Sequence, residues 1–134
     1  MKLKIVESSD LPSFAPLGIA HAVKSGNLLF ISGQISLDSE GNTVGKGDAR
    51  AQTERIYEIL KSILAQENAG LDDVVKLTTF YVNPDDFKTI AEVRNGCFNR
   101  GHVPASSSFA VKALAHPDML VEVEAIAVLD GTVT

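Results

Sequence analysis

The chain of 134 residues lacks the sequence features of disulfide-bonded, membrane-spanning, repeat and secreted proteins. It contains one cysteine, Cys97, so no disulfide can form within the chain. No apolar run approaches the ~20 residues that a membrane-spanning helix requires, and we expect no membrane association. Internal repeats and low-complexity tracts are absent, which predicts a single domain over residues 1–134. The first residues lack the apolar core of a secretory signal, so we expect a cytoplasmic protein.

Clustered positive charge and cofactor motifs are also missing. Lys and Arg number 12 against 17 Asp and Glu, which gives a formal net charge of −5, and the basic residues are dispersed. Nucleic-acid binders need a basic stripe, so we expect no nucleic-acid partner. The three histidines, His21, His102 and His116, show no metal-ligand spacing. No Walker loop, dinucleotide fingerprint or Gly-x-Ser-x-Gly motif occurs, and we expect neither a metal nor a cofactor.

What is present is a series of strand-like and helix-like segments. A first helix is expected from an N-cap at Asp48 to Gly70, and a second helix follows Asn83-Pro84. Strands are expected at Lys2–Val6, Ala20–Lys24, Leu28–Gln34, Val74–Val82, Ser107–Leu114 and Met119–Leu129. The order βββαβαββ predicts an α/β (α+β) fold, with a mixed β-sheet and two helices packed on one face. The other face then needs a partner, and self-association is the economical way to cover it.

The second predicted helix carries the one cysteine. Phe87, Ile90, Val93 and Cys97 recur at helical spacing and share one face. A cysteine in such a row is typical of a small buried hydrophobe. We therefore do not expect a nucleophilic thiol.

Polar residues around a glycine mark the first candidate site. Ser32, Gly33 and Gln34 end a predicted strand, and a glycine there lets a ligand approach the backbone closely. A β-bulge followed by a turn residue is the structural alternative. His21 lies on the neighbouring predicted strand, so it is a candidate for the same site.

Two further clusters lie near the C-terminus. Ser106, Ser107 and Ser108 form a row of hydroxyls that can donate to a carbonyl or carboxylate, or cap the local backbone. Glu122 and Glu124 alternate with apolar residues, which places both carboxylates on one face of a strand. That face is either solvated or part of a site in which one carboxylate orients a water or accepts a proton.

In their order along the chain, these segments resemble the RidA (YjgF) family. The matching pieces are Ala15-Pro16, His21-Ala22-Val23, Leu29–Gln34, Asp86-Phe87, Pro104-Ala105 and Val121–Ala127. The resemblance covers nearly the whole chain and implies a chorismate-mutase-like fold. It also implies a homotrimer that binds a small-molecule ligand in each of three clefts between neighbouring subunits. Characterised members hydrolyse reactive enamines and imines, such as 2-aminoacrylate, to keto acids and ammonia.

The resemblance breaks at three positions of that cleft. The family's substrate-clamping arginine is replaced by Ser106, its tyrosine by Ile19 and its cysteine by Ser108. A serine offers one neutral donor and cannot balance the charge of a carboxylate. Arg94 is either a replacement anchor or a solvated helix arginine.

The expected site follows from the residues that remain. The resemblance implies that Glu122 positions the attacking water, with Ser106 or Ser108 as the other catalytic groups. Substrate contacts are expected from Ile19, His21, Ser32, Gly33, Gln34 and Arg94. We expect imine hydrolysis of a substrate other than 2-aminoacrylate, or else a non-catalytic trimer that binds a metabolite or protein partner. A ribonuclease or translation-inhibitor role, attached to some members, is disfavoured by the acidic charge.

Overall fold

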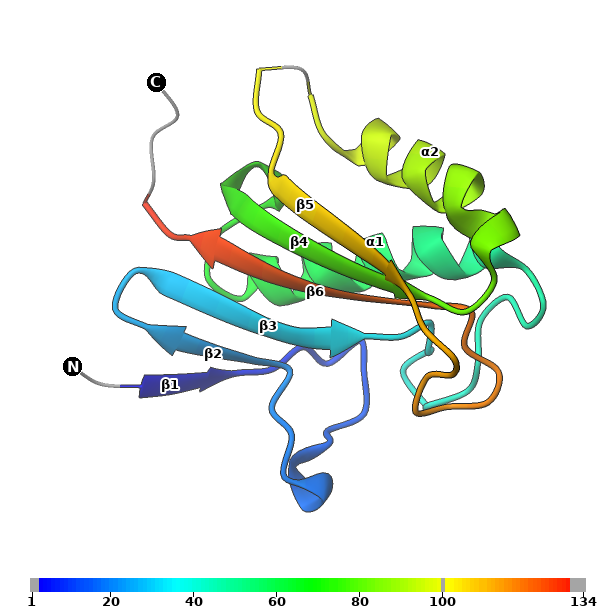
Figure 1. The fold of residues 1–134 in the computed structure, drawn as a ribbon. Helices are drawn as coiled ribbons and strands as arrows, with labels where there is room; N and C mark the ends of the chain where they lie inside the picture. The colour runs from blue at the N-terminus through cyan, green and yellow to red at the C-terminus, as the bar shows by residue number, and fades with distance from the viewer. Residues whose placement is uncertain (1–2, 100, 131–134) are drawn as a thin grey trace.

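The computed structural model describes residues 3–99 and 101–130 (Figure 1). Its strands and α-helices are β1 (Leu3–Val6), β2 (Ala22–Ser25), β3 (Leu28–Gln34), α1 (Ala49–Ala65), β4 (Val74–Tyr81), α2 (Phe87–Cys97), β5 (Ala105–Ala110) and β6 (Val121–Val128). Short 3₁₀ turns occur at Ala15–Leu17, Leu71–Asp73 and Pro84–Asp86. The predicted order of strands and helices is confirmed.

The strands form one mixed sheet in the order β1-β2-β3-β6-β4-β5. All neighbours are antiparallel except β4 and β5, which run parallel and are connected through α2. Helix α1 packs against β3 and β6, and α2 packs against α1, so both helices cover one face (Figure 1). None of the helices in the described ranges is long and apolar enough to cross a membrane.

The alternation of β6 divides the sheet into a covered and an open face. Val121, Val123 and Ala125 are buried under the helices, whereas Glu122 and Glu124 point the other way. The prediction that both carboxylates share a face is confirmed. Helix α1 completes the core with residues at helical spacing, namely Ile56, Ile59, Leu60, Ile63 and Leu64, each fully buried.

The bounds of several elements differ from the predictions. Strand β5 begins at Ala105 rather than Ser107 and ends at Ala110 rather than Leu114, because it follows the parallel ladder from Lys76 to Tyr81. The first helix ends at Ala65, since Asn68 adopts a left-handed φ of 54° before Gly70 is reached. The strands predicted at Ala20–Lys24, Val74–Val82 and Met119–Leu129 are instead β2, β4 and β6 with the bounds above. Lys2 of the first predicted strand lies outside the described residues.

The open face of the sheet carries large apolar side chains. Leu3, Ile5, Phe30 and Phe109 are between 44% and 71% exposed. Phe109 stacks on Phe80 with their ring centroids 6.0 Å apart. Exposed apolar patches of this kind mark interaction surfaces.

Candidate functional site

The first candidate region lies where β3 bulges beside the start of β6. The register between these strands shifts between Ile31 and Gln34, which places Gly33 in the irregular segment. A Cβ atom on Gly33 would collide with Oε1 of Glu122. The glycine therefore lets the carboxylate of Glu122 lie directly against the backbone of β3.

Glu122 faces a pocket of about 230 Å³, called here the Glu122 pocket. Its walls include Phe14, Leu17 and Ile19 from the N-terminal segment, together with Ile35. Burial raises the pKa of Glu122, and the neighbouring Glu124 carboxylate raises it further. A carboxyl group in such surroundings can exchange a proton closer to neutral pH than an exposed glutamate can.

Two polar side chains beside Gly33 hold the bulge in place. The Ser32 hydroxyl donates a hydrogen bond of 2.7 Å to the Ala20 carbonyl. The Gln34 amide donates to the Ser32 carbonyl at 2.9 Å, and the Gln34 side chain is buried. Both residues line the Glu122 pocket, but the Ser32 hydroxyl and one N–H of the Gln34 amide donate within the chain.

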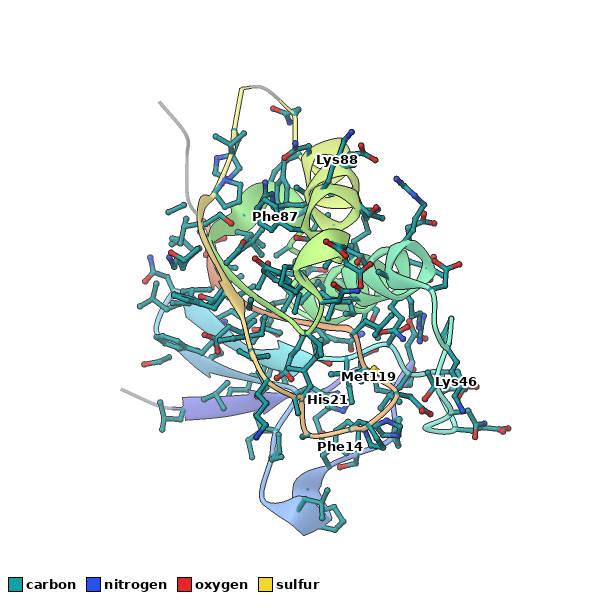
Figure 2. The ribbon with its side chains drawn as sticks, turned by 45° about the vertical axis from the view of Figure 1, so that its right-hand side comes forward. Phe14, His21, Lys46, Phe87, Lys88 and Met119 are labelled. Carbon is teal, nitrogen blue, oxygen red and sulfur yellow. The ribbon has the colours of Figure 1, made fainter. Side chains whose placement is uncertain are left out.

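His21 also lines the Glu122 pocket, next to Phe14 (Figure 2). Its Nδ1 accepts a hydrogen bond of 3.0 Å from the Ser8 backbone N–H, so Nε2 carries the proton and donates to the Pro12 carbonyl at 2.9 Å. Both ring nitrogens are engaged, and the ring is 1% exposed. His21 therefore fixes the N-terminal segment that forms the pocket wall.

A second region, called here the α2 groove, lies between α2 and the edge strand β5. Its volume is about 900 Å³. Ser106 and Ser108 line it from β5, Arg94 and Phe87 from α2, and Tyr81 from the end of β4. The rings of Tyr81 and Phe87 lie 5.5 Å apart and form an apolar wall.

The two regions lie on opposite faces of the sheet. Leu77, which is buried under the helices, pairs with Ser106 in the ladder, whereas Phe80 on the open face pairs with Glu122. Figure 2 shows Phe87 of the α2 groove well apart from His21 of the Glu122 pocket. Within one chain the structure thus joins Ile19, His21, Ser32, Gly33, Gln34 and Glu122 in one pocket, and Arg94, Ser106 and Ser108 in another.

Sequence reasoning missed the aromatic walls of both regions. Phe14, Tyr81 and Phe98 line them without belonging to any recognisable motif. For Phe87 the helical spacing gave a signal, although it indicated burial rather than a binding surface. Aromatic residues in loops and at strand ends carry no periodicity that would assign them to a pocket.

Cys97 is partly buried, and burial raises the pKa of its thiol. A raised pKa keeps the thiol protonated and makes it a poor nucleophile. Among the described residues, no group of three or more His, Cys, Asp or Glu is placed to hold a metal ion.

Comparison with known proteins gives consistent matches over most of the chain. A family model described as Endoribonuclease L-PSP matches residues 14–129. A RutC family protein of Pyrococcus abyssi is 40% identical over 113 residues, which cover 84% of this chain and 87% of that protein. A protein of Dermatophagoides farinae named 2-iminobutanoate/2-iminopropanoate deaminase is 31% identical over 116 residues, covering 86% and 89%.

A solved structure agrees with these sequence matches. That of TdcF from E. coli with bound serine superimposes with a TM-score of 0.81 at 32% identity. The match covers 93% of this chain and 98% of TdcF.

Proposed function

Because the chain belongs to the YjgF/RidA family, we propose that it hydrolyses an enamine or imine other than 2-aminoacrylate to a carbonyl compound and ammonia. The observation that carries the proposal is the half-buried carboxylate of Glu122, which lies against Gly33 in a largely apolar pocket. A relative named as an imine deaminase supports the class of reaction. Although the matching family model is described as Endoribonuclease L-PSP, the net charge of −5 disfavours binding of a polyanion such as RNA by this chain.

The proposed reaction needs one carboxylate and one water. An enamine first tautomerises to the imine, whose C=N carbon is then attacked by water. The ionised Glu122 accepts a proton from that water as the C–O bond forms. Glu122 passes that proton to the nitrogen, which gives a carbinolamine. Transfer of the hydroxyl proton to the nitrogen then breaks the C–N bond, and ammonia leaves as the carbonyl forms. The hydroxyls of Ser106 and Ser108 are suited to orienting the polar end of the substrate.

A complete site then requires two chains. Glu122 and Ser106 face opposite sides of the sheet in one subunit, so they share a cleft only where neighbouring subunits meet. The apolar open face around Phe30 and Phe109 is suited to burial against further copies of the chain. We therefore place the site between subunits of a homotrimer, with the closed symmetry that soluble homo-oligomers favour.

Replacing Glu122 tests this role. We expect Glu122→Gln to lower turnover of any imine substrate about tenfold or more, because the amide cannot accept the proton from water. Only the ionised form of Glu122 is active, so wild-type turnover should rise with pH through the raised pKa of this carboxyl group. In the variant this rise of turnover with pH, the acid limb of the profile, should be absent when the rate is measured by stopped flow as a function of pH.

Two further variants make the result specific. Glu124→Gln removes a carboxylate from the same face of β6. Turnover at pH values above the acid limb should stay close to the wild-type value, whereas the limb itself should move to lower pH, because one cause of the raised pKa of Glu122 is removed. Gly33→Ala keeps Glu122 but displaces its carboxylate, and should lower turnover while the acid limb remains. Unchanged turnover and pH dependence in Glu122→Gln would show that the carboxylate is merely solvated.

A further inference from the structure

The charges along the α2 groove are unusual for an acidic chain. Among the described residues that line the groove, Arg94 is the one with a charged side chain. The chain as a whole carries a formal charge of −5. The groove therefore presents a single positive charge, and none of its described lining residues is acidic and would repel an anion.

Arg94 also differs from the other described arginines in its partners. Arg50 forms a 2.6 Å ion pair with Glu92, and Arg55 donates to the Leu37 carbonyl at 2.8 Å. Within residues 3–99 and 101–130, the hydrogen bonds of the Arg94 guanidinium go to the neutral side-chain oxygen of Asn95, at 3.4 Å. No described carboxylate lies within 4.0 Å of it, although the side chain is partly buried. A partly desolvated guanidinium without a counter-charge favours an anionic ligand.

The opposite wall of the groove supplies further donors. The hydroxyls of Ser106 and Ser108 make no hydrogen bond to any residue in the described ranges. Tyr81, Phe87 and Phe98 add aromatic surface to the same groove. As far as the described residues show, the groove thus combines an arginine without a counter-charge, two hydroxyls without a partner and an apolar wall.

We propose that Arg94 binds the carboxylate of a ligand whose apolar part lies against these aromatic rings. The inference rests on the proposed function in one respect, since it identifies that carboxylate as part of the substrate. A guanidinium that projects from α2 holds the anion at a different place from one that projects from position 106 of β5. The substrate would then have a spacing between its carboxylate and its C–N carbon that differs from that of 2-aminoacrylate.

Calorimetric titration of the full-length protein tests the inference without any turnover. The probe is 3-phenylpropanoate, a carboxylate with an apolar ring, and its neutral counterpart is 3-phenylpropanamide. We expect the wild-type protein to bind the carboxylate about tenfold more tightly than the amide. Arg94→Gln should abolish this preference. Arg94→Lys retains the charge but cannot donate two parallel hydrogen bonds to a carboxylate, so it should keep part of the preference.

Arg50→Gln is the matched control, because it removes a surface arginine outside the groove and should bind the carboxylate as the wild type does. Equal binding of the carboxylate by wild type and Arg94→Gln would overturn the inference, as would the absence of any preference over the amide. Neither result would contradict the proposed reaction, because that reaction is tested separately by the turnover of Glu122→Gln. Conversely, an inactive protein that still binds the carboxylate through Arg94 would refute the reaction and keep the anion site.

Discussion

The wild-type protein should clear 2-aminoacrylate and its imine tautomer about ten- to a hundredfold more slowly than a family member that carries the arginine. The family resemblance implies that Ser106 occupies the position of that arginine, and Ser106 lies exposed on β5. Its hydroxyl offers one neutral donor, whereas a guanidinium forms two charge-assisted hydrogen bonds to a carboxylate. Losing such a pair costs roughly 1.5–3 kcal/mol, which corresponds to this change in rate.

The deficit should lie chiefly in kcat/KM, measured with the imine generated in situ and both proteins assayed side by side. Ser106→Arg should recover part of the missing activity, and we expect the recovery to be incomplete because the resemblance implies that Ile19 and Ser108 shape the cleft differently from the family pattern. Equal clearance by the unmodified protein and the arginine-bearing relative would mean that another residue holds the carboxylate. The proposed change of substrate would then be wrong.

A single charge on the open face should convert the proposed trimer to monomers and abolish turnover. Phe109 is 52% exposed on the edge strand, so Phe109→Glu leaves the helix-covered core intact. Burial of an unpaired carboxylate between subunits costs several kcal/mol, and this cost would arise at each subunit interface of the trimer. Native mass spectrometry at micromolar concentration should show trimers for the wild type and monomers for the variant.

Gln66→Glu supplies the control, since it adds the same charge at an exposed position beyond the end of α1 on the helix side. It should remain trimeric and active. A wild-type protein that is monomeric at micromolar concentration, or a Phe109→Glu trimer with full turnover, would remove the basis for a site between subunits.

Local patterns were sufficient to predict most of the fold. The alternation through Val121–Val128 predicted which side chains of β6 are buried, because a strand has a strict period of two. The hairpin around Gly26 and the N-cap at Asp48 were also predictable from short-range turn and capping preferences. The bounds of β5 were not, because its start at Ala105 is set by parallel pairing with the distant β4.

The candidate site was less predictable for the same reason. The family resemblance grouped Glu122 with Ser106 and Ser108 in one site. Which face of the sheet each side chain occupies depends on the register of β4, β5 and β6. His21 was predicted to bind the ligand only because it lies on the predicted strand next to Ser32–Gln34. Its partners Ser8 and Pro12 come from a segment of irregular structure, so no periodicity could have revealed that both ring nitrogens are engaged.

The most direct test of the intersubunit site is complementation between two inactive variants. Glu122→Gln removes the carboxylate, and Ser106→Trp fills the α2 groove, so each homotrimer should be inactive. After the two are unfolded and refolded together, closed trimers of random composition should regain about a quarter of wild-type turnover. This recovery arises because some clefts receive an intact Glu122 from one subunit and an intact Ser106 from its neighbour. Turnover no higher than the sum of the separate variants would contradict a site shared between subunits.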